Sequence, residues 1–183
     1  MKLLLHCCCG PCAAGSLPQF LEAGYEPFGW YWNPNIHPYQ EHKARRLSFV
    51  ELFESKGLPY EASTDYPLEE WLAAVAAAPE SRCEHCYRTR LEAAACKARD
   101  MAYPCYSTTL LISPYQNHEL LHRLGEEYGK KYGVDFAYLD LRPGFRSGQD
   151  AARQAGLYMQ KYCGCIYSEK ERYVKKKKKE RKT

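Results

Sequence analysis

The sequence has no uninterrupted apolar run near the roughly 20 residues that a helix needs to span a bilayer. Its first apolar stretch ends at His6, shorter than the core of a secretory signal, and no suitable small-residue cleavage site follows. We therefore expect a cytoplasmic protein with no membrane partner. With 45% hydrophobic residues and 16 tyrosines, the 183-residue chain has the composition of one folded domain with a real core.

Glycine-rich phosphate loops are also missing. No Gly-x-Gly-x-x-Gly motif follows a predicted strand and no Walker loop is present, which argues against a nicotinamide dinucleotide site. The Ser-Gly-Gly loop of ATP pyrophosphatases would stand after the first strand, where cysteines are found instead. The six histidines show no ligand spacing of their own. The chemistry of the protein is therefore expected to come from another residue type.

Cysteine, by contrast, is abundant, and seven of the ten cysteines fall into three clusters: Cys8, Cys9 and Cys12; Cys83 and Cys86; and Cys163 and Cys165. Structural disulfides are rare in the cytosol, and thiolates are the ligands of zinc and of iron–sulfur clusters. The clusters therefore predict a metal or redox centre. Three further cysteines stand alone in predicted strands or a helix and are expected in the core: Cys7, Cys96 and Cys105.

Each cluster leaves an alternative open. Cys12 begins a helix, whose N-terminal amides favour a thiolate, yet residues 9–12 also form the tetrapeptide of thioredoxins. Thioredoxins, however, place that tetrapeptide after a βαβ unit. Cys83 and Cys86 share one helix face and could be half of a structural zinc site. Cys163 and Cys165 flank a glycine and could be metal ligands or a redox-active pair.

Hydrophobic patterns and turn residues predict alternating strands and helices. The strands are expected at residues 2–7, 27–32, 59–63, 102–112 and 134–141. The helices are expected at residues 12–23, 38–56, 68–78, 83–100, 115–132 and 147–161, the first of them kinked or delayed by Pro18. This order predicts an α/β fold, a parallel sheet with helices on both faces. Ligands bind such sheets beyond the carboxyl ends of the strands, where the first cysteine cluster and residues 113–116 would meet.

Charge is concentrated at the end of the chain. Residues 175–183 carry seven basic residues and one acid, so their net charge of +6 exceeds the +4 of the whole chain. We therefore divide the chain into a single domain, residues 1–172, and a basic, disordered tail, residues 173–183. The tail could attract a polyanion or could be a solvated segment that aids solubility.

Five ordered motifs resemble one known family. They are His6-Cys7-Cys8-Cys9-Gly10-Pro11-Cys12, Trp32-Asn33-Pro34-Asn35-Ile36-His37-Pro38, Arg82-Cys83-Glu84-His85-Cys86-Tyr87-Arg88-Thr89-Arg90-Leu91, residues 107–116 (STTLLISPYQ) and Tyr162-Cys163-Gly164-Cys165. The chain thus resembles the QueH type of epoxyqueuosine reductase over roughly residues 2–168. In the second motif, Trp32 stands where tyrosine is more common.

The resemblance implies a HUP-like fold, related to ATP pyrophosphatases and adenine nucleotide alpha-hydrolases. It implies reductive deoxygenation of epoxyqueuosine to queuosine at the wobble position of tRNA, the last step of queuosine biosynthesis. It also implies a [4Fe-4S] cluster beside one additional iron ion, without cobalamin. An external electron donor is expected, because the chain has no flavin or nicotinamide site.

Combining this resemblance with the thiol clusters, we assign Cys8, Cys9, Cys83 and Cys86 to the [4Fe-4S] cluster. Cys12, Cys163 and Cys165 are assigned to catalysis: they hold the second iron, or Cys163 and Cys165 cycle as a redox pair. Substrate contacts are expected from polar and aromatic residues near the crevice: Asn33, Asn35, His37, Thr108, Thr109, Tyr115 and Gln116. Two competing hypotheses are a zinc-stabilised tRNA-binding module and a thiol–disulfide oxidoreductase.

Overall fold

The protein, described here by a computed structural model covering residues 1–174, is built on five parallel strands in the order β3-β2-β1-β4-β5. The strands are β1 (Lys2–His6), β2 (Glu26–Tyr31), β3 (Tyr60–Ala62), β4 (Cys105–Thr108) and β5 (Asp135–Phe136). β1 lies in the middle and pairs with β2 and with β4, so that His6 stands beside both Trp30 and Thr108. The predicted parallel α/β fold is confirmed.

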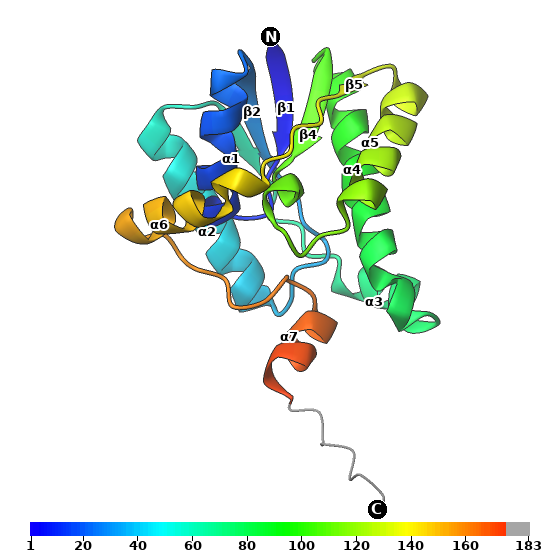
Figure 1. Ribbon diagram of the computed structural model, residues 1–183. Helices are drawn as coiled ribbons and strands as arrows, with labels where there is room; N and C mark the ends of the chain where they lie inside the picture. The colour runs from blue at the N-terminus through cyan, green and yellow to red at the C-terminus, as the bar shows by residue number, and fades with distance from the viewer. Residues whose placement is uncertain (175–183) are drawn as a thin grey trace, which may run out of the picture.

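Helices cover both faces of this sheet (Figure 1). α1 (Gly10–Glu22), α2 (Tyr39–Lys56) and α6 (Phe145–Gln154) pack on one side, and α4 (Arg82–Asp100) and α5 (His118–Tyr132) pack on the other. Leu3, Leu4 and Leu5 are consecutive and fully buried, as expected for a central strand covered on both faces. Within residues 1–174, no helix is both long enough and apolar enough to cross a membrane.

Several predicted boundaries were wrong because side-chain caps redirect the chain. The predicted strand 102–112 contains only β4, since the Thr108 hydroxyl accepts a hydrogen bond from the Leu110 amide and opens the 3-10 turn η2 (Thr109–Ile112). The Asn117 side chain caps α5 by accepting from the Leu120 amide, so that helix begins at His118 and not at residue 115. The predicted strand 134–141 reduces to the two residues of β5.

Two further differences concern helices. α1 begins at Gly10, earlier than predicted, and continues through Pro18. The predicted helix 147–161 ends at Gln154 as α6, and Gly156 follows with a φ of +70°, a left-handed conformation that favours glycine. Residues 158–165 contain no helix or strand, and we call them the strap.

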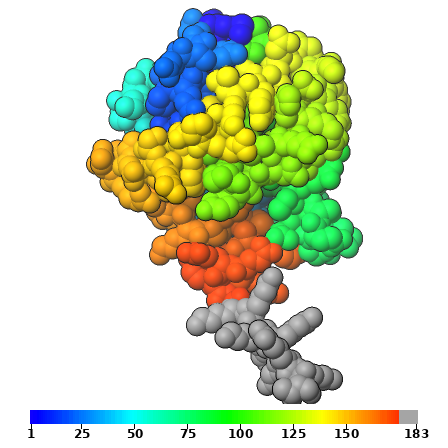
Figure 2. Space-filling model, in the orientation of Figure 1, coloured from blue at the N-terminus to red at the C-terminus, as the bar shows by residue number. Residues whose placement is uncertain are grey.

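The strap leads into a helix that the pattern analysis did not predict. α7 (Ile166–Tyr173) starts where the Cys165 sulfur accepts a hydrogen bond from the Ser168 amide. α3 (Leu68–Ala76) and the short turns η1 (Pro79–Ser81) and η3 (Arg142–Gly144) complete the described chain. The strap and α7, orange to red in Figure 2, lie across the end of the molecule toward which the strands point. The predicted tail lies outside the described residues apart from Tyr173 and Val174, and remains a prediction.

Candidate metal centre

The first cysteine cluster lies in a tight turn, residues 8–12, that leads from the end of β1 into the first turn of α1. The sulfur atoms of Cys8, Cys9 and Cys12 all lie within 4.8 Å of one another, and those of Cys8 and Cys9 are 3.8 Å apart. Cys9 is fully buried and Cys8 is 7% exposed. A Cβ on Gly10 would stand only 2.3 Å from the Ser48 hydroxyl, so this turn requires glycine. The backbone alone therefore gathers three thiols at one point.

Protonation within this turn is uneven. Hydrogen bonds from the Cys12 and Cys9 thiols, with further support from Thr109 and Arg90, hold the pKa of Cys8 well below its ordinary value. Its contact with Cys8 raises the pKa of the Cys12 thiol, and burial raises the pKa of Cys9. Cys8 is thus the thiol of the group whose deprotonation its neighbours favour most.

The other four clustered cysteines come together from distant parts of the sequence. Cys83 and Cys86 lie in the first turn of α4, and Cys163 and Cys165 lie on the strap. Burial raises the pKa of Cys86 to about 12, and the charges of Cys163 and Cys165 add to this shift. The same two thiols also raise the pKa of Cys83, after burial. The four sulfurs are therefore electrostatic neighbours, although within residues 1–174 only residues 8–12 supply three sulfurs in mutual ligand range.

We therefore describe the seven thiols as two groups: Cys8, Cys9 and Cys12, which lie in mutual ligand range, and the other four, which act on one another electrostatically. Cys12 lies with Cys8 and Cys9, whereas the sequence-based assignment places it with Cys163 and Cys165. The division of the thiols between a cluster and a second iron remains a prediction.

The hydrogen bonds to sulfur test whether these residues fit a metal. Six of the seven clustered sulfurs accept a hydrogen bond. The donors are Thr109 Oγ1 to Cys8 (3.5 Å), the Cys12 amide to Cys9 (3.5 Å), Gln160 Nε2 to Cys12 (3.5 Å), Arg90 Nη2 to Cys86 (2.9 Å), Gln116 Nε2 to Cys163 (3.7 Å) and the Ser168 amide to Cys165 (3.4 Å). Acceptor sulfurs are what thiolate ligands require. The site therefore fits a thiolate-bound metal.

Cysteines outside the clusters behave differently. The thiols of Cys7 and Cys105 donate to the carbonyl oxygens of Leu5 and Lys2, and both residues are buried in the core as predicted. The prediction was wrong for Cys96, which is half-buried on the outer side of α4 and contacts Arg99 and Asp100. A helix has two faces, and its core-facing positions here are the neighbouring Ala94, Ala95 and Ala98.

Two buried arginines lie against the thiols, and pattern analysis gave neither a role. Arg90 is 3% exposed and donates to both the sulfur and the carbonyl oxygen of Cys86. Burial works against its charge, yet Cys86, Cys163 and Cys8 together raise its pKa, so Arg90 interacts electrostatically with thiols of both groups. Arg45 is 1% exposed, and Cys9 is the thiol that most raises its pKa. Two fixed positive charges therefore stabilise negative charge at the centre.

A cavity of about 310 Å³ opens over this centre. Cys8, Cys12 and Cys163 line it, so thiols of both groups reach the same space. Three of the predicted substrate residues, Thr109, Tyr115 and Gln116, line it too. Pattern analysis missed other lining residues: Arg45, Phe145, Gln149, Gln160, Lys161 and Tyr162. Most of these come from α6 and the strap, which meet the first turn only in the folded chain.

The remaining predicted substrate residues do not line the cavity. Thr108 is fully buried and bonds His6 Nδ1 at 3.0 Å. Asn33 donates to the Cys7 carbonyl oxygen at 2.9 Å, and the His37 carbonyl oxygen accepts from the Tyr162 hydroxyl at 2.6 Å. Asn35 is also buried, close to the Cβ position of Gly164. These residues instead contact the segments that carry the cysteines, on the side away from the cavity.

Fold and site together define a class: an α/β protein with a thiolate centre at the carboxyl edge of a HUP-like parallel sheet. A solved structure entitled as a "predicted subunit of tRNA methyltransferase" from Methanocaldococcus jannaschii shares this fold, with a TM-score of 0.52 at 12% identity over 86% of this chain and 89% of that one. Residues 3–171 match the family Epoxyqueuosine reductase QueH. The chain belongs to this family.

Individual relatives agree with the family match. The epoxyqueuosine reductase QueH of Dehalococcoides mccartyi is 37% identical over 174 residues, which cover 95% of this chain and 96% of the relative. The protein of the same name from Thermotoga maritima is 31% identical, covering 94% of this chain and 93% of the relative. The predicted family and HUP-like fold are confirmed.

Proposed function

We propose that this protein reduces epoxyqueuosine to queuosine at the wobble position of tRNA, in the cytoplasm. Family membership supports the reaction, and one observation from the site carries it to this chain: three sulfurs that accept hydrogen bonds, those of Cys8, Cys12 and Cys163, line one cavity. The reaction consumes two electrons and two protons, opens the epoxide, forms the alkene and releases water. An external donor supplies the electrons.

The seven clustered thiols are proposed to hold a [4Fe-4S] cluster and a second iron, without cobalamin. Such clusters take four cysteines, so the four thiols of α4 and the strap, whose charges act on one another, are one candidate ligand set beside the sequence-based set of Cys8, Cys9, Cys83 and Cys86. When bound, these centres supply electrons one at a time and a Lewis acid for the epoxide oxygen. The assignment made from the sequence places Cys8 and Cys9 with Cys83 and Cys86. It therefore predicts that a different set of cysteine variants loses the iron and sulfide of the cluster.

The cavity residues are proposed to bind and orient the modified nucleoside. Gln160 donates from Nε2 to the Cys12 sulfur, and its Oε1 is a buried acceptor without a donor among the described residues. A hydroxyl of the substrate ring would satisfy that oxygen. Tyr115 is 84% exposed, with its edge against Phe145, and offers a face on which a splayed base can stack. Lys161 at the cavity is suited to a phosphate.

Anaerobic purification followed by iron, zinc and sulfide analysis tests the centre, and turnover of tRNA containing epoxyqueuosine tests the reaction. We expect a brown protein with iron and sulfide that forms queuosine when a reductant is supplied. Colourless zinc protein without turnover would favour the tRNA-binding module. Metal-free protein that reduces disulfides would favour the thiol–disulfide oxidoreductase.

A further inference from the structure

The strap carries Cys163 and Cys165; Met159 and Cys165 pack on apolar clusters, but the residues around Cys163 have little apolar burial. Tyr158 is 38% exposed, and Lys161 and Cys163 are exposed as well. The strap has no strand or helix of its own, so its backbone groups depend on partners elsewhere in the protein. The position of Cys163 therefore depends on a small number of polar contacts.

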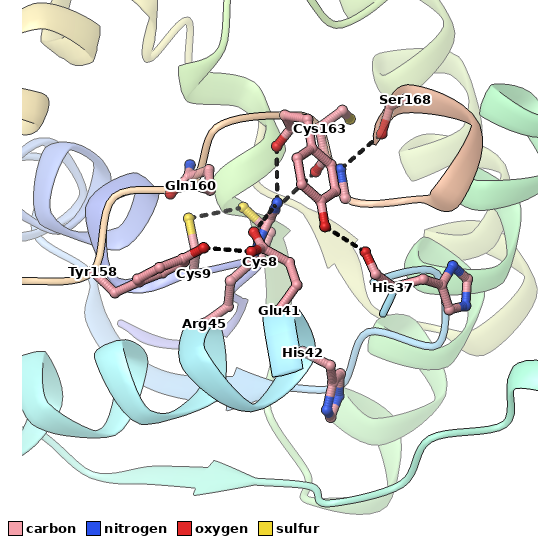
Figure 3. A network of polar contacts seen from close by, with 12 residues as sticks. Cys8, Cys9, His37, Glu41, His42, Arg45, Tyr158, Gln160, Cys163 and Ser168 are labelled. Atoms are coloured by element: carbon pink, nitrogen blue, oxygen red, sulfur yellow. Dashed lines mark hydrogen bonds and ion pairs between the residues drawn. The ribbon is translucent and has the colours of Figure 1, made fainter. Parts of the chain in front are cut away.

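Arg45 of α2 makes the most important of these contacts (Figure 3). Its Nη1 donates to the Cys163 carbonyl oxygen and its Nη2 to the Tyr162 carbonyl oxygen, both at 2.8 Å. The guanidinium carbon also lies 5.6 Å from the centre of the Tyr162 ring. A planar fork can hold two successive carbonyl oxygens at once, which the single ammonium of lysine does not reproduce.

Glu41, one turn earlier on α2, holds Arg45 in this orientation. Its Oε1 accepts from Arg45 Nε at 2.7 Å, and its Oε2 accepts from the Tyr158 hydroxyl at the start of the strap. Both members of the ion pair are buried, at 1% and 7% side-chain exposure. The pair therefore anchors the strap at both ends of the segment 158–163 and is shielded from solvent screening.

A second set of contacts continues the anchoring past Cys163. The Tyr162 hydroxyl donates to the His37 carbonyl oxygen, and the His37 amide donates to the Gly164 carbonyl oxygen at 2.8 Å. Gly164 has a φ of +152° and packs near Ile36 and Arg45, so its backbone is fixed on that side. Figure 3 shows the strap crossing above α2, with Arg45 reaching up to it.

Arg45 also faces the other thiol group. The charges of Cys9 and Cys8 act on its guanidinium, and Arg45 lines the same cavity as Cys8, Cys12 and Cys163. One side chain is therefore bonded to the strap and lies close to the turn 8–12. We propose that Arg45 is the positioning residue that fixes Cys163 across the cavity from Cys8 and Cys12. This proposal depends on the proposed function only for the identity of the metal that the thiols bind.

The test compares Arg45→Lys and Arg45→Gln with Arg46→Gln in the full chain, purified anaerobically. Arg46 is the adjacent cation on α2 and has no hydrogen bond to the strap. Hydrogen exchange of peptides covering residues 158–168 is expected to be about 10- to 100-fold faster in both Arg45 variants, because hydrogen bonds from a charged donor are lost. Peptides from β1 and β4 should keep the rate of the unmodified protein, and Arg46→Gln should change neither.

Three further readouts separate positioning from a general structural role. Iron per chain should fall in both Arg45 variants, kcat should fall more than KM rises, and lysine should not rescue the loss. Uniformly faster exchange in all peptides, or unchanged exchange in the strap, would overturn the proposal. The exchange result needs no turnover, so an Arg45 effect in a protein without reductase activity would defeat the proposed function and leave this inference intact.

Single Arg45 variants leave Glu41 buried without its partner, which can prevent folding. The double variant Glu41→Gln/Arg45→Gln avoids this, because it removes the fork without leaving a lone buried charge. We expect it to fold and to show the same local increase in exchange at the strap. A folded double variant with normal exchange in residues 158–168 and normal iron content would refute the role of Arg45.

Discussion

The two thiol groups of this protein are built in opposite ways. In the first, Cys8, Cys9 and Cys12 lie in the turn 8–12, which leads from the central strand into the first helix, and Cys8 and Cys9 are buried. The second joins the start of α4 to the strap, and two of its members, Cys83 and Cys163, are exposed. The first group is formed by local backbone geometry, whereas the second exists only when distant segments dock. Its integrity therefore depends on residues that contain no sulfur.

The largest effect is expected at the first group. Cys8→Ser removes the thiol of the turn with the lowered pKa and a cavity-lining sulfur, and should lower turnover of epoxyqueuosine tRNA about 10³-fold or more. Cys96→Ser, at the surface of α4, is the control and should leave turnover unchanged. Near-normal iron, absorbance and turnover in the Cys8 variant would mean that the turn does not hold the reacting centre.

Cys83→Ala addresses the second group and should abolish the brown absorbance of the purified protein. If the four thiols of α4 and the strap form one ligand set, Cys165→Ala should give the same loss of sulfide, and Cys12→Ala should retain most of it. If Cys12→Ala and Cys165→Ala behave alike and differ from Cys83→Ala, the assignment made from the sequence is correct. Iron and sulfide counts for all three variants decide between the two groupings.

Arg90→Gln should have the next largest effect, because it removes a buried positive charge that acts on thiols of both groups and the 2.9 Å hydrogen bond to Cys86. Reduction adds negative charge, so loss of this cation should shift the potential of the bound centre to more negative values and slow turnover about 10- to 100-fold. Arg88→Gln is the control, since Arg88 on the same helix pairs with Glu84 at the surface. A potential unchanged within error, measured by redox titration, would contradict this prediction.

Gln160→Leu should act on binding. Loss of its free acceptor oxygen should raise KM for the tRNA substrate about 5- to 10-fold, which corresponds to the net free energy of one hydrogen bond. Gln154→Leu, at the exposed end of α6, should leave KM unchanged. Equal KM values for the two variants would show that Gln160 does not contact the substrate.

The smallest effect concerns stability and the support of the strap. Burial lowers the pKa of His37 to about 4 from an ordinary 6.5, so folding favours its neutral form. The unfolded chain takes up the proton below pH 6.5, and the folded chain does so only near pH 4. The stabilisation is thus complete above pH 6.5 and is lost as pH falls toward 4, by about 1–2 kcal/mol at pH 5.

Urea unfolding at pH 7 and pH 5 measures this loss. His37→Phe should show a smaller difference between the two pH values than the unmodified protein, whereas His122→Gln, on the exposed face of α5, should not change it. An unaltered pH difference in the His37 variant would show that another group is responsible.

Local sequence predicted most of the fold. Three consecutive leucines marked the central strand, and the sequence located α1 to α4 within about two residues, in α1 to α3 with the help of glycine or proline near their ends. The short turn η1 before α4 was not predicted. Prediction from local sequence failed where a side chain redirects the backbone, as Thr108 does after β4. It also failed where the hydrophobic pattern has no period, as in the strap. The start of α7 carried a signal, a capping Cys165 with Ser168 three residues later, but cysteine is not an ordinary cap.

The site shows the same division. Cys8, Cys9 and Cys12 were predicted to lie together because their spacing alone brings them together. Asn33 and His37 were predicted to touch substrate because they follow a strand end, but sequence does not tell which side of a loop faces the cavity. Arg45 could not be found at all, since an arginine in an amphipathic helix is usually exposed.

By itself, the sequence determined the family, the parallel sheet and the first thiol turn, because each depends on residues that are close together along the chain. Tertiary structure alone decided that Cys83 and Cys86 lie within electrostatic range of Cys163 and Cys165, that the buried Arg45 and Arg90 bond Cys163 and Cys86, and which residues line the cavity. Contacts between residues far apart in sequence depend on how helices and the strap pack on the sheet, and no local pattern specifies that packing.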